Sequence, residues 1–135
     1  MKKFVLFLIT VFMFTSVLLF ADLTIQYFTG KTNSEGILIE WKTGDEGGVS
    51  SFDLERSAAN ANNFIYIAKI NATGNNSYYS YQDNSLTSKT NSSVYYYRLK
   101  CIKPDGSFSY TNNITVVYTV SGIKDTWGSI KAIFR

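Results

Sequence analysis

Tyrosine side chains are the richest set of candidate contact residues in this sequence of 135 residues. Six of them lie in two neighbouring segments, namely Tyr78, Tyr79, Tyr81, Tyr95, Tyr96 and Tyr97. An exposed tyrosine ring can stack on a sugar ring or contact a protein partner, and Tyr79 and Tyr96 are the candidates for this role. The alternative is that the tyrosines are cross-strand packing pairs. We favour packing, because half of the rings alternate inward and the others lie beside Arg98 and Lys100, which suggests cation–π cover.

Residues for catalysis and metal binding are scarce. The chain has no histidine, which removes the usual general base and the commonest neutral metal ligand. Asp45, Glu46 and Asp53 could in principle ligate calcium, but the D-x-D-x-D-G pattern of a calcium loop is absent. Cys101 has no histidine partner, which indicates an inert core thiol. We therefore predict no catalytic residue, no metal site and no cofactor, and we expect that the chain is not an enzyme.

The first 21 residues have the pattern of a signal peptide. Lys2 and Lys3 precede an apolar stretch from Phe4 to Ala21, as a charged n-region precedes an h-region. We predict a signal helix over residues 1–21 with cleavage after Ala21, and hence an exported protein that is extracellular or at the cell surface, with the periplasm as an alternative. The rival interpretation is a membrane anchor through an uncleaved signal segment, because this stretch reaches the lower length limit of a spanning helix.

The rest of the chain is long enough for one domain, over residues 22–120, with a short tail over residues 121–135. The formal charge of +3 includes Lys2 and Lys3, so the chain after residue 21 is close to neutral and we expect no nucleic-acid partner. Cys101 is the only cysteine. No internal disulfide can form, and packing must stabilise the domain.

Short runs of alternating apolar and polar residues recur along the chain, separated by Gly, Asn, Ser and Asp. This pattern indicates an antiparallel all-β domain. We predict seven strands, over residues 24–28, 37–43, 51–57, 64–70, 78–83, 94–102 and 108–120. Pro104 and Gly106 predict a tight hairpin between the last two strands.

The apolar positions of these strands fall on one face. The predicted structural core consists of Ile39, Trp41, Phe52, Leu54, Tyr95, Tyr97 and Leu99. The alternate positions, such as Glu40, Lys42 and Asp53, are polar and point to solvent. Two sheets that are each apolar on one face must cover one another, which predicts a seven-stranded antiparallel sandwich.

Three segments together resemble a known family. They are Trp41-Lys42-Thr43, Phe52-Asp53-Leu54-Glu55-Arg56-Ser57 and Tyr95-Tyr96-Tyr97-Arg98-Leu99-Lys100. With these spacings, residues 23–120 are similar to a fibronectin type III-like domain, an immunoglobulin-like sandwich, of the kind found in large secreted and surface proteins of Bacteroidetes-like bacteria. The resemblance implies that Trp41 is the core tryptophan of the second strand. It also implies that Tyr95 is the tyrosine whose hydroxyl closes the corner before the sixth strand.

The tail after Val120 carries an apolar face that needs cover. Its docking candidates are Trp127, Ile130, Ile133 and Phe134. A helix would place Trp127, Ile130 and Ile133 or Phe134 along one stripe. A strand would make Ile130, Ala132 and Phe134 alternate with Lys131, Ile133 and Arg135. Both conformations stay open, as do two destinations: the open end of the same sandwich, or another subunit or export component.

The leading hypothesis from these features is an exported, non-enzymatic protein-interaction or structural module, a subunit of an extracellular assembly that docks through its C-terminal tail. We expect a protein partner or self-assembly. The alternative is a carbohydrate-binding module that uses the exposed tyrosines Tyr79 and Tyr96, with a polysaccharide as its partner.

Overall fold

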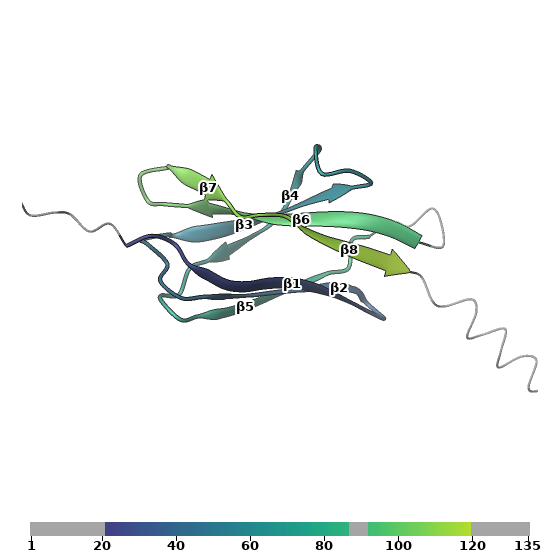
Figure 1. Cartoon of the computed structure of the whole chain (residues 1–135), viewed down its shortest axis with the longest axis horizontal. Helices are drawn as coiled ribbons and strands as arrows, with labels where there is room; N and C mark the ends of the chain where they lie inside the picture. Colours follow the sequence, from purple (N-terminus) through teal and green to yellow (C-terminus); the bar gives the residue numbers. More distant parts are fainter. Residues whose placement is uncertain (1–20, 87–91, 120–135) are drawn as a thin grey trace, which may run out of the picture.

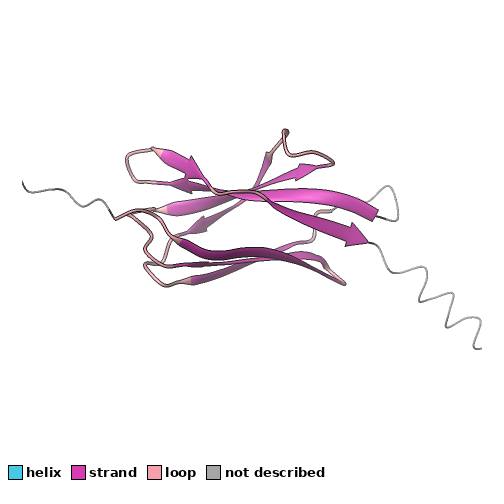
Figure 2. Ribbon diagram, in the orientation of Figure 1, coloured by secondary structure: helices cyan, strands magenta, loops and turns pink. Residues whose placement is uncertain are grey.

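The computed structural model describes residues 21–86 and 92–119, which form an all-β domain of eight strands. The strands are β1 (Ile25–Asn33), β2 (Gly36–Thr43), β3 (Ser51–Ala58), β4 (Ile65–Asn71), β5 (Tyr78–Asp83), β6 (Ser92–Ile102), β7 (Phe108–Tyr110) and β8 (Ile114–Thr119). Figure 2 shows strands joined by loops throughout this part of the chain.

Several predictions lie outside the described residues. Residues 1–20 of the predicted signal helix fall there, as do the docking candidates Trp127, Ile130, Ile133 and Phe134. Among the residues that the structure does describe, no helix is long and apolar enough to span a membrane.

The strands form two antiparallel sheets that face one another (Figure 1). One sheet has the order β1-β2-β5, and the other has the order β4-β3-β6-β7, with β8 also paired to β6. The tight hairpin predicted at Pro104 and Gly106 joins β6 to β7: the Lys103 amide donates to the Ser107 carbonyl at 2.8 Å, and Gly106 has a φ of 86°. Only glycine adopts this φ without steric cost.

The predicted seventh strand over residues 108–120 is in fact two strands. β7 pairs with the C-terminal end of β6, and β8 pairs with its N-terminal half. Between them, the Leu99 amide donates to Thr111 Oγ1 at 3.0 Å and the Thr111 amide donates to the Leu99 carbonyl at 3.0 Å. The side-chain oxygen of Thr111 thus accepts from the Leu99 amide, in place of the backbone carbonyl of a regular ladder. The regular ladder stops there and resumes at Ile114.

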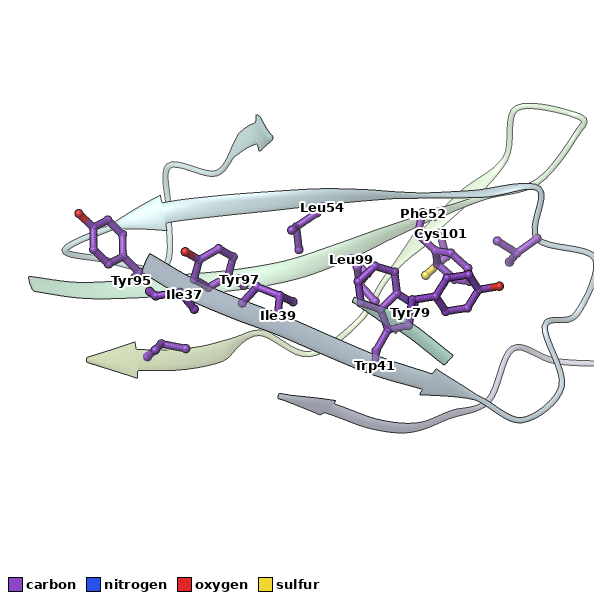
Figure 3. Close-up of a cluster of buried hydrophobic side chains, with 12 residues drawn as sticks. Ile37, Ile39, Trp41, Phe52, Leu54, Tyr79, Tyr95, Tyr97, Leu99 and Cys101 are labelled. Atoms are coloured by element: carbon purple, nitrogen blue, oxygen red, sulfur yellow. The ribbon is translucent and has the colours of Figure 1, made fainter. Parts of the chain in front are cut away.

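The core lies between the sheets and contains every side chain predicted for it. Ile39, Trp41, Phe52, Leu54, Tyr95, Tyr97 and Leu99 are all buried, and Figure 3 shows them projecting into the space between the strands. The indole ring of Trp41 stacks on the ring of Tyr79 with centroids 5.1 Å apart and meets Phe52 edge-on at 5.9 Å. Burying a large apolar side chain stabilises the fold by about 1.5–3 kcal/mol.

Glycine permits a close approach of β1 and β8 at the open side of the sandwich. A Cβ atom added at Gly30 would lie 2.5 Å from Cγ2 of Val116 and 3.1 Å from Cδ1 of Ile39. The missing side chain therefore lets the edge strand of one sheet pack directly on β8 of the other.

A buried carboxylate joins the ends of the two sheets. Asp83, at the end of β5, is 1% exposed and accepts hydrogen bonds from Tyr97 Oη at 2.7 Å and from Arg56 Nη1 at 2.6 Å. Ser85 donates its amide and hydroxyl to the other carboxylate oxygen. Burial opposes ionisation, but the hydrogen bonds from Ser85, Tyr97 and Arg56 outweigh it and lower the pKa of Asp83.

Tyr97 makes a hydroxyl contact across the β5–β6 connection, while the corner contact expected of Tyr95 stays a prediction, because residues 87–91 of that corner lie outside the described residues. Tyr97 lies in β6 and its hydroxyl contacts Asp83 at the end of β5, so the bond joins the two strands that this connection links. Burial and the bond to the Asp83 carboxylate both raise the pKa of Tyr97, so its hydroxyl is a fixed donor. Tyr95 is buried as well, and its ring packs edge-on against Tyr118 with centroids 6.5 Å apart.

Candidate functional site

Tyr79, one of the two predicted contact residues, is part of the core, and this corrects the prediction. Its side chain is 6% exposed, and in the β2–β5 register it lies opposite Trp41. Its hydroxyl donates to Glu46 Oε1 and accepts from the Thr73 amide at 2.8 Å. The ring faces pack against Trp41 and Phe52 (Figure 3). Tyr79 therefore has no free face on which a sugar could stack.

Tyr96, the second predicted contact residue, lies on the outer face of the larger sheet. Its neighbours Tyr95 and Tyr97 point into the core, so the alternation of β6 turns Tyr96 outward, where it is partly exposed. Arg98 and Lys100 follow on the same outer face. This row of β6 is the starting point of the candidate site.

Aromatic rings surround the two cations of this row. Cζ of Arg98 lies 4.1 Å from the ring centroid of Phe64 and 3.9 Å from that of Tyr110, so the guanidinium is held between two rings. Nζ of Lys100 lies 4.2 Å from the ring centroid of Phe108. Cation–π contacts of this kind contribute about 0.5–1 kcal/mol each at exposed sites.

Strand register explains why these groups meet. In the β6–β7 pair, Tyr110 lies opposite Lys100 and Phe108 lies opposite Ile102. Each ring contacts the cation that lies two residues earlier in β6 than the residue opposite the ring, so Tyr110 contacts Arg98 and Phe108 contacts Lys100. Aromatic and long side chains can span this diagonal distance. The rings of Phe108 and Tyr110 also pack edge to face, with centroids 5.5 Å apart.

The surface formed in this way is called here the cation–aromatic face. It consists of Phe64, Tyr66, Tyr96, Arg98, Lys100, Phe108 and Tyr110. Three of the rings are about half exposed: Tyr66 is 60% exposed, Phe108 54% and Tyr110 45%. An ion pair between Arg98 Nε and Glu55 Oε2, at 2.7 Å, anchors the centre of the face.

A groove of about 430 Å³ adjoins this face, where the start of β1 faces the segment between β7 and β8. Tyr110 lines the groove and also belongs to the cation–aromatic face. The other wall includes Tyr27, which is 40% exposed, and the groove is lined further by Asp22, Asn112 and Asn113. Rings, amides and a carboxylate in a concave site of this size can hold a small polar ligand.

The carboxylates considered for calcium do not form a metal site. Over residues 21–86 and 92–119, no three side chains of His, Cys, Asp or Glu gather closely enough to hold a metal ion. The carboxylate of Glu46 is buried, and Thr43, Tyr79 and the Gly74 amide donate to it. It holds two loops together. Cys101 is 1% exposed, and burial raises its pKa to about 12, so it is a thiol packed in the core.

Four residues of the face were not predicted from the sequence as binding residues, namely Phe64, Tyr66, Phe108 and Tyr110. A signal for the last two was present, because the hairpin at Pro104 and Gly106 places the alternating pair Phe108 and Tyr110 back alongside β6. No local pattern marks Phe64. It precedes β4, and only the packing of β4 beside β3 brings it over Arg98.

Comparisons with known proteins give one likeness in fold. No family model and no curated protein matches the chain. Among solved structures, the chain is similar to the crystal structure of pectate lyase PelI from Erwinia chrysanthemi in complex with tetragalacturonic acid, with a TM-score of 0.50 and 17% identity. The match covers 71% of this chain but spans only 28% of the pectate lyase. At this identity the likeness concerns the fold.

This finding corrects the leading functional hypothesis. The solved neighbour is a pectate lyase in complex with a sugar-acid oligomer, and not a protein-interaction or structural module. The tail that was to provide the docking surface lies outside the described residues. The exposed rings of the cation–aromatic face are the feature from which the carbohydrate-binding alternative is argued below. The expectation that the chain is not an enzyme stays a prediction.

Proposed function

We propose that this protein is an exported carbohydrate-binding domain, which holds a polysaccharide on the cation–aromatic face and in the adjoining groove. The observation that carries the proposal is the pair Phe108 and Tyr110. Both rings are about half exposed, yet contacts with Lys100, with Arg98 and with one another fix their positions.

Stacking on a sugar needs rigid, exposed rings. The apolar face of a pyranose packs on an aromatic ring, and aromatic side chains bring a large contact area with few rotatable bonds. Contacts with Arg98 and Lys100 already restrict the rotamers of the rings in the free protein. Less side-chain entropy is therefore lost when a ligand binds. The cation–aromatic face is therefore organised for stacking before any ligand arrives.

The groove supplies the polar half of sugar recognition. Hydroxyl groups of a sugar both donate and accept hydrogen bonds, and the amides of Asn112 and Asn113 and the carboxylate of Asp22 can serve both needs. Since Tyr110 belongs to both surfaces, one chain of sugars can contact the face and the groove together.

Two further observations support the proposal. The two-sheet arrangement agrees with the fibronectin type III-like resemblance of residues 23–120, which we keep as the proposed family. The solved structure that shares the fold belongs to a protein in complex with tetragalacturonic acid. Export, proposed from the first 21 residues, would bring such a domain to extracellular polysaccharides.

Affinity electrophoresis in gels that contain a polysaccharide tests this function. We expect retardation of the parent protein and loss of most of the retardation in Tyr110→Ala, with a smaller loss in Tyr96→Ala. Tyr78→Ala is the matched control: Tyr78 is 54% exposed but belongs neither to the cation–aromatic face nor to the lining of the groove, so its loss should leave migration unchanged. Unretarded migration of the parent protein in gels of neutral and acidic polysaccharides would sink the proposal.

A further inference from the structure

The guanidinium of Arg98 exposes only part of its surface to solvent. Its central carbon, Cζ, lies over the rings of Phe64 and Tyr110, and Nε donates to Glu55 at 2.7 Å. The side chain is nonetheless 27% exposed. The donors that remain for a ligand are the N–H groups of Nη1 and Nη2, at the edge of the guanidinium.

These edge donors have no acceptor among the described residues. The Glu55 bond uses one of the five guanidinium N–H groups, which leaves four on the two terminal nitrogens. A planar fork of this kind matches the two oxygens of a carboxylate and binds them side by side. Glu55 is itself only 14% exposed, so its charge lies beneath the surface and not in the path of a ligand.

A second cation follows along the same strand. Lys100 lies two residues after Arg98 on the outer face, a spacing of about 6.6 Å along a strand. It has no ion pair with any described residue, although Asp53 lies opposite it in the β3–β6 register. Lys69, which faces Asp53 from β4, is likewise without an ion pair there. The three cations exceed the two carboxylates Asp53 and Glu55.

We propose that the polysaccharide bound by this protein is acidic, with carboxylate groups on its sugar rings. Arg98 holds one carboxylate through its terminal N–H groups, Lys100 attracts a carboxylate further along the chain, and Phe108 and Tyr110 stack on the rings between them. This inference rests on the proposed carbohydrate binding and adds the chemical class of the ligand.

A matched pair of polymers separates the two proposals. Polygalacturonate and its highly methyl-esterified form have the same backbone, but esterification removes the carboxylate charge. We expect the protein to bind polygalacturonate about tenfold more tightly, as the loss of charge-assisted contacts implies. Equal binding of both polymers would overturn the acidic class and leave carbohydrate binding intact. Binding of neither polymer, nor of any neutral polysaccharide, would overturn both.

Two variants locate the charge recognition. Lys100→Gln should weaken binding to polygalacturonate about fivefold, and by a clearly larger factor than binding to the esterified polymer, for which it removes only the support of the Phe108 ring. Arg98→Lys keeps the charge but loses the planar fork, and it should weaken polygalacturonate binding by a similar factor. Lys31→Gln is the control, since it removes the same charge from an exposed site on the other sheet. An equal effect of Lys31→Gln and Lys100→Gln would show that only net charge matters and would overturn the site.

Discussion

The hydroxyl of Tyr97 donates a 2.7 Å hydrogen bond to Oδ2 of Asp83, and both groups are almost fully buried between the sheets. Tyr97 belongs to β6 of the larger sheet, whereas Asp83 ends β5 of the smaller one. The bond therefore ties the two layers together at one end of the domain.

Removal of this hydroxyl should lower stability. We expect Tyr97→Phe to reduce the free energy of unfolding by about 1–3 kcal/mol, because a buried charged acceptor loses one of its donors. Urea denaturation monitored by fluorescence measures the change. Tyr66→Phe is the matched control, because Tyr66 is 60% exposed and the loss of its hydroxyl should change stability by no more than about 0.5 kcal/mol. Equal midpoints for the parent and Tyr97→Phe would contradict the structural role.

The same carboxylate predicts acid sensitivity. The pKa of Asp83 is lower in the folded than in the unfolded protein, so its contribution to stability is fully present above the unfolded value of about 4. This contribution is lost as the pH falls below that value through the folded pKa. Urea midpoints measured between pH 6 and pH 2.5 should fall less steeply for Asp83→Asn than for the parent. Glu35→Gln is the control, since the Glu35 side chain is exposed in the turn between β1 and β2; an unchanged slope in Asp83→Asn would rule out the linkage.

We expect Tyr79 to contribute to stability and not to polysaccharide binding. Tyr79→Phe removes the hydroxyl that donates to Glu46 and accepts from the Thr73 amide, and it should lower the free energy of unfolding by about 1–3 kcal/mol. Retardation in polysaccharide gels should stay the same for the folded variant. A loss of retardation without a loss of stability would return Tyr79 to the binding site.

Gly30 sets the distance between β1 and β8. Gly30→Ala would bring a methyl group against the stiff, β-branched side chain of Val116, and we expect a destabilisation of about 1–3 kcal/mol from overpacking. Thermal unfolding by calorimetry provides the measurement. Gly44→Ala is the control, because its nearest neighbours at 3.4 Å are in ordinary van der Waals contact. If both variants unfold at the temperature of the parent, the close approach is not required.

The sequence alone was sufficient for the fold class and the core. Period-2 alternation placed Trp41, Phe52 and Leu99 on inward faces, and the structure buries all three. The hairpin at Pro104 and Gly106 also followed from local chemistry, because turn residues determine backbone conformation without help from distant parts of the chain. These features depend on residues that are close in sequence.

The number of strands and the identity of the exposed tyrosines depended on pairing between distant strands. In β5 the run Tyr78, Tyr79 and Tyr81 has aromatic residues on both faces, so alternation alone could not say which ring is inside. The register with β2 decides it, because it places Tyr79 opposite Trp41. The break between β7 and β8 likewise depends on the contact of Thr111 with Leu99, which no local pattern indicates.

The candidate site itself is a product of the tertiary structure. Arg98 and Lys100 stood out in the sequence as neighbours of tyrosines, and their outward direction followed from the alternation of β6. Their aromatic partners come from the segment before β4 and from β7, far apart in the chain. Alternation predicts which face of a strand a residue occupies, but only the strand order and register decide which side chains share that face.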